Sequence, residues 1–171
     1  MWMLGFALNN LAQAAYLEGD LAQAFTLIDE SVALFRDLNA YSSLAEVLVT
    51  QGHILRAQGQ AAAANAALSE ALRLAWAVEP RLFVAAALEG LAVLASQPEH
   101  TALAARLIGA ASALRAEMGT PVRPADRDSV EQALATARSA PMPSLRRGLR
   151  SKPYRLNRLS APSPLTLTYI P

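Results

Sequence analysis

Apolar positions recur along the first 120 residues with the three-to-four spacing of an amphipathic helix, and the pattern repeats every forty residues. The repeat is visible as columns that hold one class of residue in each copy. These columns are Leu8, Leu48 and Leu88; Ala12, Gly52 and Ala92; Ala24, Ala64 and Ala104; Ile28, Leu68 and Ile108. A fixed period of this size is typical of stacked repeat architectures. The pattern predicts three repeats, at 1–40, 41–80 and 81–120.

Each repeat is predicted to be a hairpin of two helices. The strings Glu18-Gly19-Asp20 and Gln58-Gly59-Gln60 separate two apolar stripes in the first and second repeats. Glycine there takes the left-handed conformation that ends a helix, and Asp20 is placed to cap the next one. The third break, Ser96-Gln97-Pro98-Glu99, contains no glycine.

One more helix and a tail of different composition are expected after the repeats. Pro121 and Pro124 interrupt the chain, and an apolar stripe follows, so 121–138 is predicted to form a capping helix. Residues 139–171 hold six of the ten prolines and no acidic residue, and we expect this tail to be disordered.

Composition agrees with an all-α fold. The 171 residues include 37 alanines, no cysteine and only 6% aromatic residues, which favours closely packed helices over a sheet. The net charge of +1 is a cancellation, because residues 1–138 carry −5 and the basic tail carries +6. Charged residues interrupt every apolar stretch, and Met1–Leu8 lacks the basic start of a secretory signal. A cytoplasmic chain without a membrane span is expected.

The repeats resemble the tetratricopeptide (TPR) family. The order Leu8, Leu11-Ala12, Gly19-Asp20, Ala24, Ile28, Ser31 carries the resemblance. It returns as Leu48, Gly52, Gly59, Ala64, Leu68, Ala71 and then, without the turn glycine, as Leu88, Leu91-Ala92, Ala104, Ile108, Ala111. The period departs from the usual 34 and suits the longer-helix variant of MalT-like regulators. The resemblance implies a right-handed superhelix of about three helix-turn-helix repeats.

Longer strings narrow the resemblance over about residues 4–138. ALNNLAQAAYLEGD, ESVALFRDL, LEGLAVLA and AARLIGAASALRAEMGTPVRPADR are similar to the C-terminal helical region of large bacterial AfsR-like or LuxR-type regulators that contain a signalling ATPase. What this implies is a protein-interaction or regulatory module cut from a larger regulator, without the ATPase itself.

The tail also carries a hypothesis about its reading frame. The related regulators continue with a string such as LG-x-x-AFAAAWAEG. When residues 139–149 (SAPMPSLRRGL) are written in GC-rich codons and read one base earlier, they yield LGADAFAAAWA. We therefore hypothesise a frameshift near residue 138, and the sequence of the coding DNA would decide it.

The motifs of common enzymes are missing from the sequence. It contains no G-x-x-x-x-G-K-[ST] phosphate loop, no G-x-G-x-x-G, no G-x-S-x-G and no H-E-x-x-H. His53 and His100 stand far apart with no other ligand type grouped around them. We expect no catalysis, no cofactor and no metal.

Binding is the favoured function, and the family resemblance implies that the first helix of each repeat lines a concave groove. The groove candidates are Phe6, Asn9, Gln13, Tyr16, Glu46, His53, Arg56 and Glu89, with Val49, Val93 and Ser96 beside them. Their side chains are expected to be exposed and to hold a peptide backbone or carboxylate. The same residues are also typical of an ordinary solvated helix face.

Three further interpretations stay open. The groove is an alternative site for a small effector of a transcription regulator. A second alternative is nucleic-acid binding by the basic tail, through Arg146, Arg147, Arg150, Lys152, Arg155 and Arg158 with Tyr154. Trp2 and Met3 mark a repeat end for self-association, whereas Trp76, Leu82 and Phe83 are expected to fill the core.

Overall fold

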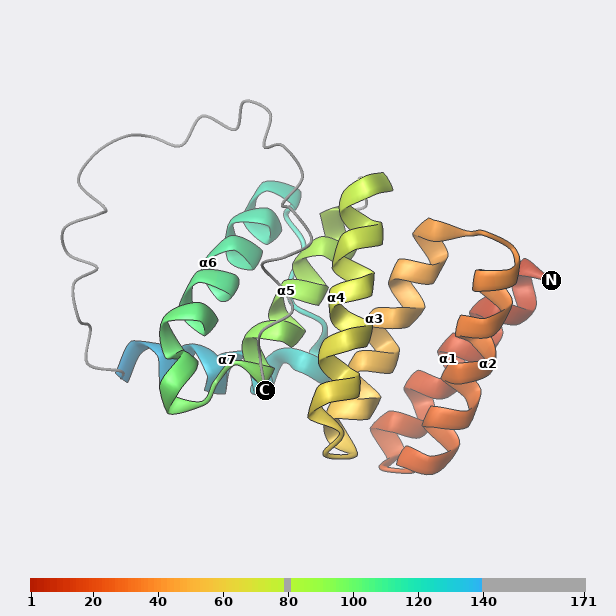
Figure 1. Cartoon of the computed structure of the whole chain (residues 1–171), viewed down its shortest axis with the longest axis horizontal. Coiled ribbons are helices and arrows are strands. Elements are labelled where there is room, and N and C mark those ends of the chain that lie inside the picture. The colour runs from red at the N-terminus through yellow and green to blue at the C-terminus, as the bar shows by residue number, and fades with distance from the viewer. Residues whose placement is uncertain (79–80, 140–171) are drawn as a thin grey trace.

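The computed structural model describes residues 1–78 and 81–139, and each regular element in them is helical (Figure 1). The elements are α1 (Trp2–Glu18), α2 (Leu21–Asp37), α3 (Tyr41–Ala57), α4 (Ala61–Val78), α5 (Arg81–Leu94), the 3-10 turn η1 (Pro98–His100), α6 (Thr101–Met118) and α7 (Pro124–Ser139). The all-α class is confirmed. The expectations for the tail beyond Ser139 lie outside the described residues.

Consecutive helices pack against one another along the chain. The pairs α1 and α2, α3 and α4, and α5 and α6 make the most extensive contacts, as expected of three hairpins. The first helices of these pairs also meet, since α3 contacts both α1 and α5. The α7 helix contacts α5 and α6 and runs across them (Figure 1).

The predicted glycine turns are present. Gly19 and Gly59 have φ angles of 85° and 77°, in the left-handed region that glycine adopts without strain. Asp20 caps α2, because its Oδ1 accepts a hydrogen bond of 3.0 Å from the backbone N–H of Gln23. The third break has no glycine turn and forms η1.

Small residues allow the helices to approach closely. Ala12, Ala24, Ala64 and Ala92 are fully buried. Leu68 of α4 packs where α3 and α5 each place a glycine: a Cβ on Gly52 would lie 2.5 Å from its Cγ, and one on Gly90 would lie 2.9 Å from its Cδ1. Gly52 and Gly90 therefore leave room for the side chain of Leu68.

Two expectations about large side chains need correction. Trp76 and Leu82 do not fill the core, because they are 44% and 41% exposed, and of that group only Phe83 packs against buried residues. Trp2 and Met3 are exposed, as expected of a repeat end. Within the described residues, no helix is long and apolar enough to cross a membrane.

Candidate functional site

The groove candidates lie on α1, α3 and α5, but the structure buries several of them. Asn9, His53 and Glu89 are at most 4% exposed, and Val49 beside them is buried too. Phe6 and Tyr16 are half-buried and pack against the core. The expectation that these side chains lie exposed along an open groove is therefore wrong for Asn9, His53, Glu89 and Val49.

Glu89 is held by a partner that the sequence reading did not single out. Arg115 of α6 donates from Nε and Nη2 to the two carboxylate oxygens of Glu89, at 2.9 and 2.8 Å. Both side chains are buried. The geometry is that of a bidentate arginine–carboxylate pair. Glu89 consequently ties α5 to α6 and is not available to a ligand.

The α7 helix supplies the partners of the remaining candidates on α3. Asp126 places Oδ1 3.0 Å from Nδ1 of His53, and its Oδ2 accepts a 2.7 Å hydrogen bond from Nε of Arg123. One turn further along α3, Arg56 donates to the Oγ of Ser129 at 3.4 Å. The start of α7, which packs on α5 and α6, thus reaches α3 through Asp126 and Ser129, on the side where a groove was expected.

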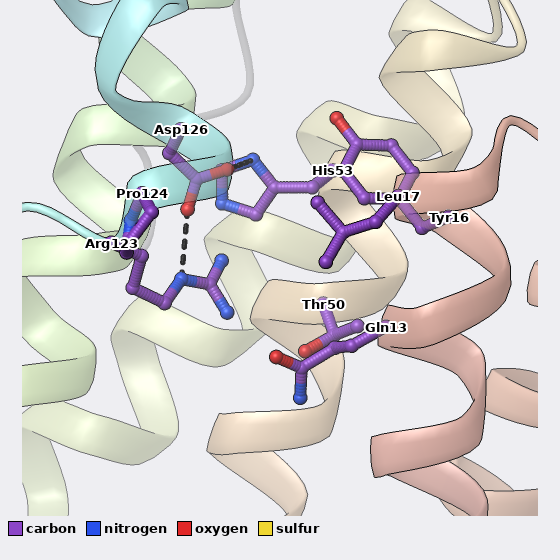
Figure 2. A pocket seen from close by; sticks show the side chains of 8 residues that line it. All are labelled: Gln13, Tyr16, Leu17, Thr50, His53, Arg123, Pro124 and Asp126. Atoms are coloured by element: carbon purple, nitrogen blue, oxygen red, sulfur yellow. Dashed lines mark hydrogen bonds and ion pairs between the residues drawn. The ribbon is translucent and has the colours of Figure 1, made fainter.

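What stays open between α1, α3 and the start of α7 is a pocket of about 240 Å³. Its lining residues are Gln13, Tyr16, Leu17, Thr50, His53, Arg123, Pro124 and Asp126 (Figure 2). Figure 2 shows the guanidinium group of Arg123, the residue just before α7, extending toward the space beside Thr50 and Gln13. Three of the predicted groove residues, Gln13, Tyr16 and His53, are therefore brought together in one site.

Burial determines the charge state of His53. Removal from water lowers its pKa to about 4; the Asp126 carboxylate opposes that shift, and Arg123 and Arg56 reinforce it. His53 is therefore neutral at pH 7. A neutral imidazole carries one proton, and the nitrogen that faces a carboxylate is the one that holds it. Nδ1 then bears the proton, and Nε2 is left as an acceptor.

The neighbouring Glu46 is shifted in the opposite direction. Burial raises its pKa, and the positive charge of Arg123 partly offsets the effect. Oε1 of Glu46 also accepts a hydrogen bond of 3.3 Å from Nδ2 of Asn9. Asn9 and Glu46 therefore satisfy each other in part behind the pocket.

Four polar atoms of pocket-lining residues are buried without a hydrogen-bond partner among the described residues: Oγ1 of Thr50, both ring nitrogens of His53 and Oδ1 of Asp126. Nδ1 of His53 and Oδ1 of Asp126 face each other at 3.0 Å. That leaves Oγ1 of Thr50 and Nε2 of His53, on side chains that are 3% and 4% exposed. Most buried polar atoms in native proteins are paired, so such groups at a pocket wall indicate a missing partner. Thr50 lies one turn before His53 on α3 and was not among the sequence candidates, because an isolated threonine inside an apolar helix gives no signal.

A second hollow of about 220 Å³ lies at the α4 and η1 end of the molecule. Its lining residues are Ala61, Ala62, Asn65, Leu94, Gln97, Glu99 and His100. Its polar side chains are exposed or half-buried, so water satisfies them. The pocket at His53 is the better candidate for a binding site.

Metal binding has no support in the described part of the chain, where no three His, Cys, Asp or Glu side chains gather as a ligand set. Comparisons with protein-family models, with curated proteins and with solved structures found no match for this chain.

Proposed function

We propose that this chain is a non-catalytic regulatory module that binds a small polar molecule in the pocket between α1, α3 and α7. The observation that carries the proposal is the pair of buried, unpartnered atoms at the pocket wall, Thr50 Oγ1 and His53 Nε2. Leaving such a group unpaired costs about 1–3 kcal/mol, which a ligand of the right chemistry recovers.

The lining residues define that chemistry. Nε2 of His53 accepts a hydrogen bond, so the ligand needs an N–H or O–H group. Arg123 offers donors to a ligand oxygen, while Leu17 and Pro124 form an apolar wall. Arg123 and Asp126 carry opposite charges and His53 is neutral, so a ligand without net charge, such as a zwitterion or a neutral polyol, fits best. The pocket volume of about 240 Å³ limits it to roughly eight non-hydrogen atoms, on the scale of about 30 Å³ for each water.

The wider architecture is part of the same proposal. The forty-residue period, the hairpin pairing and the contacts of α3 with both α1 and α5 support a TPR-like stack. With the resemblance to AfsR-like and LuxR-type regulators, this supports a cytoplasmic segment of a bacterial signalling ATPase or transcription regulator. In that setting the pocket would report an effector to the rest of the regulator.

A protein-interaction scaffold is the second candidate function. The observation that favours it is the exposed apolar face of α1, which includes Met3, Leu4 and Leu11. A peptide in the concave groove is less well supported, because His53, Arg56 and Glu89 already have partners within the chain.

A thermal-shift screen tests the proposed pocket. The probes are the free amino acids and a set of neutral sugars and polyols, each added to the full chain at millimolar concentration. A bound probe at about 100 times its Kd stabilises the folded state by about 2.7 kcal/mol, which is readily measured. Thr50→Val is expected to abolish the shift, since it removes the pocket hydroxyl with little change of shape.

The matched control is Thr26→Val on α2, whose hydroxyl bonds within its own helix to the Ala22 carbonyl. It should retain the full response. If the screen gives no shift, or if a shift persists undiminished in Thr50→Val, the pocket is not the binding site.

A further inference from the structure

The outer face of α1 is apolar and lacks a neighbouring helix among the described residues. Met3 is 86% exposed, and Leu4 and Leu11 are 52% and 56% exposed. Ala7 lies between Leu4 and Leu11, Ala14 follows Leu11 by one turn on the same face, and both are exposed. A contiguous apolar surface of this kind on a helix marks an interaction site.

The repeat itself shows what this face does elsewhere in the fold. A shift of forty residues brings Leu4, Ala7 and Ala14 to Leu44, Val47 and Ile54 of α3, which are 3%, 0% and 0% exposed. The counterpart of Leu11 is Gln51, which is half-buried and donates a 3.2 Å hydrogen bond to Asp29 of α2. The hairpin of α1 and α2, both of which contact α3, therefore lies on this side of α3. The exposed face of α1 therefore consists of the same repeat positions that α3 buries against the first hairpin. It is a surface on which another hairpin can stack.

The absence of charged residues from most of α1 limits which surface can bind its exposed face. The sixteen residues from Trp2 to Leu17 contain no acidic or basic side chain. The opposite end of the molecule is unsuited to this face, because α7 exposes Arg127, Asp128 and Glu131. Stacking α7 of one copy on α1 of the next would bury these charges without partners, which is strongly unfavourable.

A second α1 fits where α7 does not. Two α1 helices can be aligned antiparallel so that residue i of one copy faces residue 18 − i of the other. Leu4 then meets Ala14, and Ala7 meets Leu11. Each large side chain then faces a small one, which allows two helices to interdigitate at close distance. The surface is also self-complementary, as a two-fold interface requires.

The exposed apolar area on this face is modest. Its large side chains are Met3, Leu4 and Leu11, with Ala7 and Ala14 beside them. Together they offer about half of the roughly 800 Å² per partner of a standard interface, which places the pair at the low end for protein interfaces.

From this geometry we propose that two copies of the chain form a two-fold dimer through antiparallel pairing of their α1 helices, with Ala7 opposite Leu11 at its centre. The facing residues Leu4, Ala7, Leu11 and Ala14 do not line the pocket, whose residues on α1 are Gln13, Tyr16 and Leu17. The polar pocket residues Thr50 and His53 lie on α3.

Light scattering after gel filtration of the full chain tests the dimer. The expected mass is twice the 18.2 kDa of the monomer. Leu11→Glu should give a monomer with unchanged helix content, because Leu11 is exposed in the single chain. Leu103→Glu, on an exposed leucine of α6, is the control and should remain dimeric.

Engineered disulfides test the register, and the chain offers a clean background because it has no cysteine. The variant Ala7→Cys/Leu11→Cys should form a covalent dimer on mild oxidation, while Arg106→Cys/Ala110→Cys on α6 should not. A monomeric wild type, a dimer that survives Leu11→Glu, or equal cross-linking of the two cysteine variants would overturn the proposal.

Discussion

Arg115 and Glu89 form a bidentate, buried ion pair that joins α6 to α5, with N–O distances of 2.9 and 2.8 Å. The same two helices carry a second pair, Arg81 and Glu117, at 3.2 Å, whose side chains are 64% and 47% exposed. One helix interface therefore contains a buried and an exposed version of the same interaction.

Removing one member of the buried pair should be severe. Glu89→Gln leaves the Arg115 guanidinium buried without a counter-charge, which costs about 3–5 kcal/mol. Urea unfolding followed by circular dichroism measures the loss. Glu117→Gln at the exposed pair is the control and should cost less than about 1 kcal/mol, because water screens that pair. Equal losses would mean that the buried pair has no special role.

Replacing both members of the buried pair separates charge from packing. In Glu89→Met/Arg115→Met, two flexible apolar side chains fill the site and no charge is left unpaired. We expect most of the stability lost in Glu89→Gln to return. A double variant as unstable as the single one would show that the fold needs the ion pair itself.

The glycine opposite Leu68 should not tolerate a methyl group. In Gly52→Ala the new Cβ would lie 2.5 Å from Leu68 Cγ, so α3 and α4 must move apart. We expect a loss of about 1–3 kcal/mol from overpacking, larger than the gain of about 1 kcal/mol in helix propensity. Thermal unfolding measures the balance.

Gly109 of α6 is the matched control for that substitution. A Cβ there meets nothing within 4 Å. Gly109→Ala should therefore stabilise the protein by about 0.5–1 kcal/mol through propensity alone. If both alanine variants shift stability in the same direction, the close approach at Leu68 does not govern the interface.

Acid should destabilise the fold through His53. Burial lowers its pKa from 6.5 to about 4, so below pH 6.5 the unfolded chain binds a proton that the folded chain does not. The stabilising contribution of the neutral histidine is present in full above pH 6.5 and is lost as the pH falls through about 4, with a slope of at most about 1.4 kcal/mol per pH unit.

The variant His53→Gln isolates this contribution when urea unfolding is repeated between pH 7 and pH 4. It should show a flatter dependence of stability on pH than the wild type. Glu46 acts with the opposite sign, because burial raises its pKa and its ionisation on raising the pH disfavours the folded state. That contribution is common to both proteins, so an unchanged difference between them across the pH range would contradict the assignment to His53.

Thr50→Val should make the ligand-free protein more stable. The Oγ1 of Thr50 is buried without a partner, and valine replaces it with a methyl group of similar size. We expect a gain of about 1 kcal/mol in the free energy of unfolding, measured in urea. Loss of stability would mean that the hydroxyl is already satisfied in the folded protein. If Thr50→Val raises the free energy of unfolding and also loses the ligand response, the Thr50 hydroxyl contributes to binding and lowers stability.

Much of the fold was predictable because its signals are local. The spacing of Leu8, Leu48 and Leu88 marks the helices, Gly19 and Gly59 mark the turns, and Asp20 marks a cap, and each depends on only a few neighbouring residues. The α7 helix was likewise predicted from its proline start and apolar stripe. Its packing on α5 and α6, with Asp126 and Ser129 reaching α3, was not, because no local signal says where a helix docks.

The candidate site was predicted only in part, for the same reason. Gln13, Tyr16 and His53 do line the pocket, but Thr50, Arg123 and Asp126 were not foreseen as its other polar members. Glu89 has the same appearance in sequence whether it faces water or a buried arginine 26 residues away. A periodic pattern identifies the apolar side of a helix. It does not predict which polar side chains are buried by a helix that comes later in the chain.

The sequence by itself determined the helices, their pairing into hairpins, the glycine turns and the small-residue columns that let the helices approach. Only the tertiary structure decided which polar residues became core pairs and which formed a pocket. Arg56 and Ser129 are 73 positions apart, and they meet only because α7 packs on α5 and α6 with its first turns beside α3. The physical reason is that helix formation is set by neighbours in the chain, whereas the burial of a polar side chain is set by whatever distant segment removes it from water and offers it a partner.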